Sequence, residues 1–503
     1  MIDVGAPDFA LGVVGAGAMG SGIAQVALTG GIAVILSDAS EAQLDKARTT
    51  LFARIDRLAE KRELKPDQAA AAKARLTLAH DIGALAPCGV VVEAIVEDLD
   101  VKRKVFRALE EIVRKDAILA SNTSSIPIAA IAAACRHRRR VAGLHFFNPV
   151  PLMRLVEVIA SADTDPAVVK ALAALGERMG RTPVVVKDAP GFLVNFGGRA
   201  YYQEALHILQ ESVATPEDID LVMRECCGFR MGPFELLDLT GMDVNYPVSE
   251  IVLKGYGYDP RVKTTPLHAS MHLAGRLGRK SGHGFYRYDA EGKKVASPPM
   301  TAPAAAVKPA RVILPEPQEG LVALAVAAGV ETQAPDDGAS PIMIAPWGED
   351  CTAAAVRLGL DPRRTVAVDL SHDTGKRITQ MMAPSGAAAS GDAVAALLAA
   401  AGRAVTRIKD SPGFIAQRIT AMIANIGCEM AQMGLASPAD IDKAMQLGLN
   451  YPLGPLGFAE KMGVRPTYEI MRRLFESTGS DRYRPSLWLR RRALLGLPAA
   501  TPD

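Results

Sequence analysis

The segment His145–Glu157 begins and ends with side chains that can transfer protons, an imidazole and a carboxylate twelve positions apart. His145 follows the strand-like run 141–144, so we expect it at the carboxyl end of a strand, where open α/β sheets bind ligands. Glu157 lies within a second apolar run, 155–159, where a carboxylate needs a polar partner. An imidazole held by a carboxylate is a general base that works near neutral pH, so the pair predicts a catalytic base and its orienting acid.

A glycine-rich turn near the start of the sequence predicts a dinucleotide site. The turn Gly15-Ala16-Gly17-Ala18-Met19-Gly20 follows the apolar run 9–15 and opens a helix-like segment of small residues. Its glycines allow a tight turn, close approach of a pyrophosphate to the backbone, and packing of helix on strand. Asp38, eighteen residues past Gly20, is expected to bind ribose hydroxyls and to repel a 2′-phosphate. NAD is therefore favoured over NADP; the alternative is a glycine-rich helix–strand contact beside a solvated aspartate.

Further polar groups follow predicted strands at the same edge of the sheet. Glu97 and Lys102 come after a valine-rich run and are candidates to contact the cofactor's ribose and phosphates. Such charges are more often a helix start with a solvated face. In the segment 121–125, SNTSS, one hydroxyl is expected to cap a helix and another to bind a substrate oxygen. Asn195 could return over the same cleft.

The elements that must position these groups alternate between strands and helices. This alternation indicates a doubly wound parallel sheet, and hence an α/β Rossmann-type domain. After residue 186 the pattern becomes mainly helical. The predicted strands occupy residues 9–15, 32–37, 90–92, 117–120, 141–144, 155–159 and 182–186, with a helical hairpin at 40–80.

An internal repeat indicates a duplicated helical unit. Residues 187–243 align with 409–465 without gaps at an offset of 222, with 15 identities over 57 positions. Shared turn chemistry explains a single Pro-Gly-Phe but not fixed spacing over the whole block. Between the copies, short strand candidates and no GxGxxG motif predict a degenerate Rossmann-like fragment. The predicted domains are 1–186 (Rossmann), 187–290 (all-α), 291–310 (linker), 311–408 (the fragment, with strands at 312–314, 342–344 and 366–368 and a helix near 392–401) and 409–503 (second all-α).

The composition is that of a soluble globular protein with two to four domains. The 503 residues are 49% hydrophobic and 22% charged, with a net charge of +2, which gives no argument for a nucleic-acid partner. The six cysteines form no CxxC pair, so we expect reduced thiols and no metal site. Without a signal-peptide pattern or an apolar run of about 18 residues, a cytoplasmic protein with no membrane partner is expected.

These motifs together resemble the L-3-hydroxyacyl-CoA dehydrogenase family. The segments GAGAMG with Asp38, SNTSS, GLHFFNPVPLMRLVEV, KDAPGFLVN, MGPFELLDLTG and GRKSGHGFY occur in family order across residues 10–288. A second Gly-Pro-Leu block and the segment 481–485, DRYRP, are similar to longer bacterial members that act on 3-hydroxyadipyl-CoA in phenylacetate degradation. The resemblance implies NAD-dependent oxidation of an (S)-3-hydroxyacyl-CoA, either 3-hydroxyadipyl-CoA or 3-hydroxybutyryl-CoA.

The resemblance also implies roles for individual residues. His145 matches the catalytic base, Glu157 its orienting acid, and Ser124 and Asn195 the pair that binds the substrate's 3-oxygen. The implied cofactor contacts are Gly15, Gly17, Ala18, Met19, Gly20, Asp38, Glu97, Lys102, Asn122, Ser124, Asn148 and Lys280. Arg54 and Lys61, in the helical hairpin, are suited to the CoA phosphates.

The second half lacks this chemistry. At the offset of 222, the positions of His145, Glu157 and Asn195 are occupied by Ala367, Thr379 and Gln417. One active site per chain is therefore expected. The two helical units are expected to pair within the chain as a pseudo-dimer, with a homodimer as a further option. Two alternatives stay open: a dehydrogenase of the same fold that acts on a free hydroxy acid, and a non-catalytic NAD-binding structural protein. The side chains available to bind a distal substrate carboxylate are Arg199, His207 and Arg230.

Overall fold

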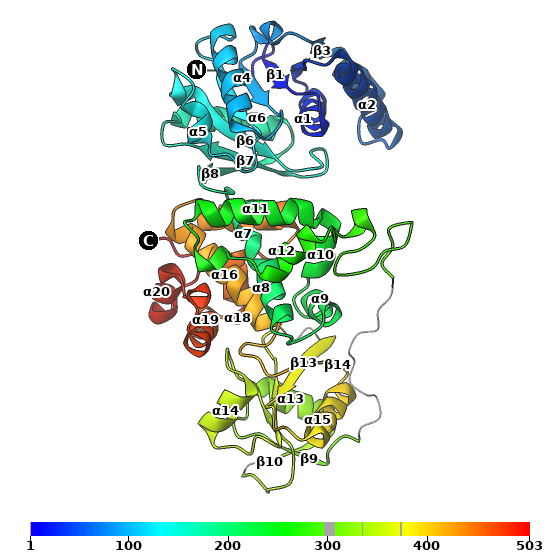
Figure 1. Ribbon diagram of the computed structural model, residues 1–503, viewed down its shortest axis with the longest axis vertical. Coiled ribbons are helices and arrows are strands. Elements are labelled where there is room, and N and C mark those ends of the chain that lie inside the picture. Colours follow the sequence, from blue (N-terminus) through cyan, green and yellow to red (C-terminus); the bar gives the residue numbers. More distant parts are fainter. Residues whose placement is uncertain (1, 296–306, 334, 373–374) are drawn as a thin grey trace. The chain divides into compact units, whose positions relative to one another are not determined.

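The chain forms two compact units in the computed structural model (Figure 1). Unit 1 comprises Met1–Phe196 and Gly434–Leu449, and unit 2 comprises Gly197–Met433 and Asn450–Asp503. The structure describes all residues except 1, 296–306, 334 and 373–374. Most of the predicted linker 291–310 therefore lies outside the described residues.

Unit 1 is built on an eight-stranded sheet with the order β3-β2-β1-β4-β5-β6-β7-β8. Neighbouring strands are parallel except β6 and β7, which run antiparallel. Strands β4, β5 and β6 are buried along their whole length, as parallel strands between layers of helices must be. The strands are β1 (Ala10–Val14), β2 (Ala33–Ser37), β3 (Leu76–Ala79), β4 (Val90–Glu93), β5 (Ile118–Ser121), β6 (Val141–Phe146), β7 (Leu155–Ala160) and β8 (Thr182–Lys187).

The connections of this sheet confirm the predicted Rossmann-type domain. Every predicted strand of the first half is present, with ends shifted by at most two residues. The predicted hairpin 40–80 contains two helices but ends in β3, a strand that the charged, alanine-rich sequence did not indicate. The helices of unit 1 are α1 (Ala18–Thr29), α2 (Glu41–Glu60), α3 (Pro66–Ala74), α4 (Leu99–Ile112), α5 (Ile128–Ala132), α6 (Pro166–Arg178) and α17 (Pro438–Leu449), and α7 (Val194–Gly197) spans the boundary between the units.

Unit 2 contains the other helices and a second sheet. Its first helices confirm the predicted all-α region. They are α8 (Arg199–Gln210), α9 (Pro216–Glu225), α10 (Pro233–Thr240), α11 (Met242–Gly255) and α12 (Pro266–Leu273). The later helices are α13 (Glu319–Ala327), α14 (Cys351–Leu358), α15 (Ala388–Ala400), α16 (Ala416–Gln432), α18 (Pro455–Met462), α19 (Val464–Thr478) and α20 (Leu487–Leu495).

The second sheet has six strands in the order β10-β9-β11-β12-β13-β14. Its last four strands repeat the pairing of β5 to β8, including one antiparallel pair, here β12 with β13. Asp188 and Asp410, related by the offset of 222, each accept two backbone N–H bonds from the helix that follows β5 or β11. The strands are β9 (Arg311–Ile313), β10 (Glu331–Gln333), β11 (Ile342–Ile344), β12 (Thr365–Val368), β13 (Arg377–Met382) and β14 (Ala404–Arg407).

The register of this sheet corrects one expectation from the sequence. In unit 1, His145 stands opposite Glu157 in the ladder between β6 and β7. In unit 2 the residue bonded opposite Thr379 is Asp369, whose N–H donates to the Thr379 carbonyl at 2.9 Å. Asp369, and not Ala367, is therefore the counterpart of His145. The ungapped offset missed this because the two partners are ten positions apart in the second sheet rather than twelve.

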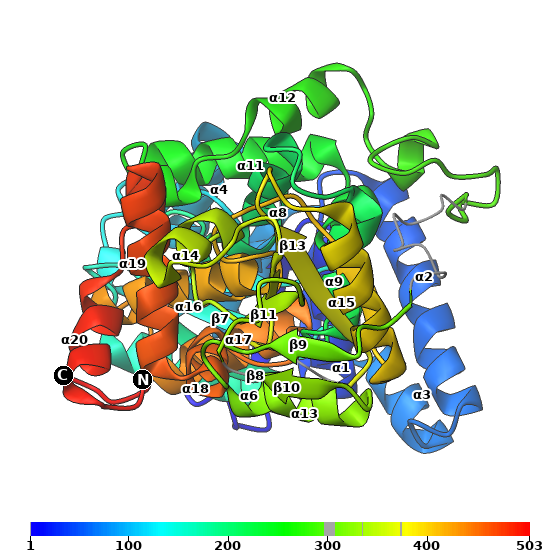
Figure 2. The ribbon, with the colours of Figure 1, turned by 90° about the horizontal axis from the view of Figure 1, so that it is seen from below.

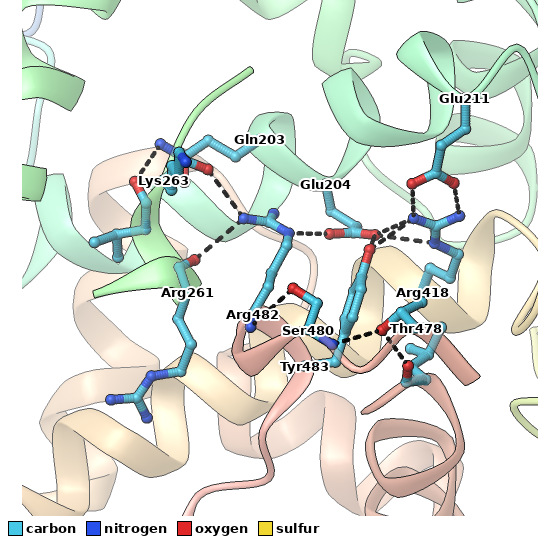
Figure 3. Close-up of polar contacts among 12 residues, drawn as sticks. Gln203, Glu204, Glu211, Arg261, Lys263, Arg418, Thr478, Ser480, Arg482 and Tyr483 are labelled. Carbon is cyan, nitrogen blue, oxygen red and sulfur yellow. Dashed lines mark hydrogen bonds and ion pairs between the residues drawn. The ribbon is translucent and has the colours of Figure 1, made fainter. Parts of the chain in front are cut away.

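A buried charge cluster joins the helices of unit 2 (Figure 3). Glu204 of α8 is fully buried, and its carboxylate binds Arg418 of α16 at 2.8 Å and Arg482 at 2.9 Å. The Tyr483 hydroxyl donates to it at 2.9 Å, and Arg418 also binds Glu211 at 2.6 Å. Burial alone would raise the pKa of Glu204, but the charges of Arg418 and Arg482 lower it to about 2. The cluster ties the first repeated segment to residues that come far later in the sequence.

Two backbone hydrogen bonds are exchanged between the repeated segments. In unit 1, the Lys187 N–H donates to the Leu435 carbonyl at 2.9 Å. In unit 2, the Lys409 N–H donates to the Val213 carbonyl at 3.0 Å. The four positions correspond at the offset of 222, so equivalent residues of the two repeated segments make the same kind of bond in each unit. Accordingly, α17 packs on β7 and β8 (Figure 2), and α9 packs on β13.

Candidate active site

A buried imidazole–carboxylate pair lies at the carboxyl end of β6. The Nδ1 atom of His145 lies 2.7 Å from Oε2 of Glu157, and the two side chains are 6% and 1% exposed. Because the carboxylate engages Nδ1, Nε2 is the ring nitrogen that can take up a proton from a substrate. The Phe147 ring packs on the imidazole, with 4.5 Å between the ring centroids. The structure thus brings together the two residues that the sequence singled out first.

The second carboxylate oxygen of Glu157 is held by the backbone that starts the helical region. The N–H groups of Leu193 and Val194 donate to Oε1 at 3.1 and 3.0 Å. The chain reaches these donors through two consecutive left-handed residues, Gly191 at φ 74° and Phe192 at φ 51°. A side chain at Gly191 would strain this turn. The Pro-Gly-Phe motif therefore aims two donors at the acid, which fixes both oxygens of Glu157.

The serine-rich loop after β5 is organised by Glu97. Its Oε1 accepts bonds from the Thr123 hydroxyl at 2.6 Å and from the Ser125 hydroxyl at 2.8 Å. Burial pushes the Glu97 pKa upward, but these bonds and the Lys102 charge outweigh it, so the pKa is lowered. The loop is also bound to Asn195, whose amide donates to the Ser124 carbonyl at 3.2 Å. The Asn195 side chain and the Ser124 backbone are therefore in contact.

Lys102 is a buried scaffold for this loop. Its ammonium binds Glu93 at 2.7 Å and Glu97 at 3.3 Å, and its side chain is 1% exposed. The Ser121 hydroxyl donates to the other oxygen of Glu93 at 2.6 Å. Glu93 was not predicted from the sequence because it ends an apolar strand. A carboxylate in such a strand is itself a signal for a buried partner. Glu93 and Glu97 thus compensate the buried charge of Lys102.

The glycine turn between β1 and α1 is shaped to receive a diphosphate. Gly15 has φ 101°, and a Cβ atom there would lie 2.6 Å from the Ala94 carbonyl. A Cβ at Gly20 would lie 1.8 Å from the Gly15 carbonyl, so α1 can approach the turn only without it. A Cβ atom at Gly17 would meet no described atom within 4 Å beyond its chain neighbours, and α1 has no side-chain cap at its N-terminus. Open space beside uncapped N–H groups fits the pyrophosphate of NAD.

Asp38 closes the other side of this turn. One carboxylate oxygen accepts the Ala16 N–H at 2.8 Å and the other accepts the Ser40 N–H at 3.0 Å. Both oxygens of the carboxylate are thus held by backbone N–H groups beside the glycine turn. A pocket of about 210 Å³ extends from the turn to α2 and is lined by Gly17, Ala18 and basic Lys46 among others. Met19 faces inward and packs against the core.

A second pocket of about 370 Å³ brings the basic hairpin to the loop after His145. Arg54, Arg57 and Lys61 line one side, and Asn148 with the prolines that follow it lines the other. Three cationic side chains at one pocket suit an anionic group such as a phosphate. Asn122 connects the loop after β5 to the end of β6, because its Oδ1 accepts the Phe146 N–H at 2.8 Å.

Lys280 is the one expected cofactor contact in the other compact unit. It lies in unit 2, where its ammonium binds Asp243 at 2.7 Å and lowers the pKa of that carboxyl. Within the described ranges, no group of three or more His, Cys, Asp or Glu residues is arranged to hold a metal ion. All six cysteines are buried as free thiols. In the part of the chain that the structure covers, no helix combines the length and apolar character that crossing a membrane requires.

Sequence models of one protein family match most of the chain. The NAD-binding domain of 3-hydroxyacyl-CoA dehydrogenase matches residues 10–189. The C-terminal domain of the same family matches twice, at 191–288 and at 413–501. The second match begins within the repeated segment and runs beyond it, so both helical regions are of one type.

Known proteins are similar to between about half and nearly all of the chain. A 3-hydroxyadipyl-CoA dehydrogenase of Escherichia coli (strain K12) is 38% identical over 96% of this chain and 97% of its own length. A 3-hydroxybutyryl-CoA dehydrogenase of Bradyrhizobium diazoefficiens is 38% identical over 55% of this chain and 94% of its own. The crystal structure of 3-hydroxybutyryl-CoA dehydrogenase from Escherichia coli K12 matches with a TM-score of 0.87 and 36% identity, covering 97% of this chain and 98% of that one. The chain belongs to the 3-hydroxyacyl-CoA dehydrogenase family and is an NAD-dependent oxidoreductase.

Proposed function

We propose that His145 is the general base of this dehydrogenase and that Glu157 orients it. The observation that carries the proposal is the buried bond of 2.7 Å between Nδ1 and Oε2, which commits the acid to one ring nitrogen and leaves the other for the substrate. His145 accepts the proton of the 3-hydroxyl group, and Glu157 stabilises the imidazolium that forms. NAD, when bound, supplies the hydride acceptor.

Ser124 and Asn195 hold the reacting oxygen in this proposal. The Asn195 amide donates to the backbone carbonyl of Ser124 at 3.2 Å, which holds the Asn195 side chain against the serine-rich loop. Donors fixed in advance stabilise the carbonyl as it develops, because they need no reorganisation during the reaction. Gly15, Gly17, Gly20 and Asp38 hold the cofactor.

The substrate is a CoA thioester, with Arg54 and Lys61 binding its phosphates in the pocket of about 370 Å³. A free hydroxy acid would leave these cations unused. The first candidate for the acyl group is that of 3-hydroxyadipyl-CoA, after the relative of that name, which is 38% identical over 96% of this chain. The second is 3-hydroxybutyryl-CoA, after the solved structure that is 36% identical over 97% of this chain.

No side chain in the described residues singles itself out for a distal carboxylate. Arg199 is held by Ser249 at 3.1 Å and Arg230 is exposed. Burial and the Arg482 charge lower the pKa of His207 to about 4, so it is neutral at pH 7. A panel of 3-hydroxybutyryl-, 3-hydroxyhexanoyl- and 3-hydroxyadipyl-CoA, ranked by kcat/KM from NADH absorbance, tests the acyl assignment. The highest value for 3-hydroxyadipyl-CoA supports it, and a value tenfold below that of 3-hydroxybutyryl-CoA rejects it.

The second half is a duplicated, non-catalytic copy that pairs with the first as an intrachain pseudo-dimer. Support comes from the double match to one domain type and from the exchanged bonds Lys187–Leu435 and Lys409–Val213. Deleting residues 300–503 would expose the apolar faces that the copy covers. We expect aggregation or a new dimer of the shortened chain in size-exclusion chromatography, whereas a soluble and active monomer would reject the pseudo-dimer.

A further inference from the structure

Helix α17 comes from the second half of the sequence but belongs to the compact unit that holds the catalytic pair. It packs on β7, the strand of Glu157, and on the edge strand β8. The loop before it is fixed to β8 by the bond from Lys187 to Leu435. This helix is therefore in a position to influence the site, although the second half has Asp369 and Thr379 in place of His145 and Glu157.

Gly448 of α17 lies against Leu155 and Val194. A Cβ atom at this position would lie 2.9 Å from Cδ2 of Leu155 and 3.2 and 3.3 Å from the two γ-carbons of Val194. Both side chains are buried, with exposures of 0% and 1%. Val194 is branched at Cβ and has little rotamer freedom, so it cannot turn aside easily. Only glycine lets the backbone of α17 lie against these two residues without displacing them.

The two residues that touch Gly448 are the ones that position the acid. Leu155 precedes Glu157 by two residues in β7, so both side chains point to the same face of the sheet. Val194 donates its N–H to the Glu157 carboxylate at 3.0 Å, and Asn195 follows it directly. A displacement at Val194 moves a donor of Glu157 and the neighbouring amide together.

The equivalent place in unit 2 lacks this feature. At the offset of 222, Cys226 corresponds to Gly448, and its Sγ atom lies 3.4 Å from the carbonyl of Arg377, the first residue of β13. The strand there carries Thr379 where β7 carries Glu157, so no catalytic acid depends on this contact. The glycine stands on the side that has the catalytic pair.

We propose that Gly448 is a positioning residue for Glu157, and that the non-catalytic half supports the active site through α17. The inference rests on the proposed role of Glu157. Substitution of Gly448 by valine forces Leu155 and Val194 away from α17, which misplaces Glu157 and Asn195 relative to His145. The glycine turn that binds the cofactor makes no part of this contact.

The test compares steady-state kinetics of Gly448→Val, Gln446→Val and Glu157→Gln in the full chain, with 3-hydroxybutyryl-CoA and NAD. Gly448→Val is expected to lower kcat at least tenfold and to leave the KM for NAD within twofold. Gln446→Val adds the same side chain at an exposed position of α17 and is expected to retain kcat within twofold. A wild-type kcat in Gly448→Val beside a slow Glu157→Gln overturns the inference alone. A wild-type kcat in Glu157→Gln overturns the proposed function.

A double-mutant cycle separates positioning from loss of folding. Gly448→Ala adds one methyl group, and Val194→Ala removes two methyl groups from the side chain against which it would press. If the contact transmits the effect, the double variant is at least threefold more active than the two single variants predict together. Independent effects of the two substitutions overturn the inference, including the case in which Gly448→Val yields no folded protein.

Discussion

His145 and Glu157 are direct partners across an antiparallel strand pair, with Nδ1 and Oε2 2.7 Å apart. In this sheet, β6 and β7 are the only antiparallel neighbours among the described strands. Residues directly opposite each other on such a pair have Cβ atoms about 5 Å apart, so the backbone ladder itself sets the spacing of base and acid. The antiparallel pairing of β7 with β6 therefore places the Glu157 carboxylate beside the His145 imidazole.

Replacing His145 by glutamine removes the proposed base but keeps a polar side chain of similar size. We expect turnover of 3-hydroxybutyryl-CoA to fall at least about a hundredfold, the usual contribution of general-base catalysis. NADH binding, measured by fluorescence titration, should change less than twofold because the glycine turn is untouched. A variant that turns over at a near-normal rate would refute the assignment.

Replacing Asp38 by alanine removes the carboxylate that accepts the Ala16 N–H and is fixed beside the glycine turn. Charge-assisted hydrogen bonds contribute about 1.5–3 kcal/mol, so the KM for NAD should rise roughly tenfold or more. The ratio of kcat/KM for NAD to kcat/KM for NADP should fall, because the charge that repels a 2′-phosphate is gone. An unchanged ratio would show that Asp38 does not select the cofactor.

Replacing both Arg54 and Lys61 by alanine removes two cations from the pocket beside Asn148. The KM for a CoA substrate should rise at least fivefold, and the increase should shrink in high salt because ions screen the phosphates. The matching pantetheine thioester, which lacks the nucleotide, should show no change. Arg48→Ala serves as the control, since Arg48 is exposed on the same helix and lies outside the pocket. Equal effects on both thioesters would contradict the assignment.

Replacing Glu204 by glutamine leaves Arg418 and Arg482 buried without their shared carboxylate. The free energy of unfolding should fall by about 3–5 kcal/mol at pH 7. Glu211→Gln is the control, because Glu211 is 46% exposed and should contribute less than about 1 kcal/mol. Urea unfolding of the three proteins measures both effects.

The same substitution predicts a pH dependence. The pKa of Glu204 is about 2 in the folded chain against a reference value of 4.5, so the unfolded chain binds more protons between these values. Stability from this carboxylate is therefore complete above about pH 4.5 and is lost as the pH falls toward 2. The difference in unfolding free energy between wild type and Glu204→Gln should shrink over that window. A constant difference would contradict the lowered pKa.

The sequence predicted seven of the eight strands of the first sheet and the pairing of His145 with Glu157, because each has a local signature. Buried parallel strands are continuous apolar runs, and glycine turns need particular residues. Strand β13 escaped prediction because Thr379 and Gln380 are buried polar residues that break such a run. Glu93 and Lys102 could not be paired from the sequence, since their contact depends on how α4 returns to the sheet.

The pairing of segments that are distant in the sequence could not be predicted, for a different reason. Nothing in the residues 434–449 indicates that they join the first unit, because an apolar helix face does not specify its partner. The same holds for Asp369, which a shortened hairpin moves into the place opposite Thr379. Local chemistry determines elements, whereas the pairing of distant elements depends on the geometry of the whole chain.

The bond between Lys187 and Leu435 also bears on the order in which the chain matures during translation. A ribosome makes His145 and Glu157 long before it makes α17, and early domains usually fold before synthesis ends. Until residue 434 emerges, the outer strand of the first sheet has no covering loop and offers free backbone groups to other chains. We expect ribosome-bound chains halted before that point to recruit chaperones, and full enzymatic competence to arrive only late in synthesis.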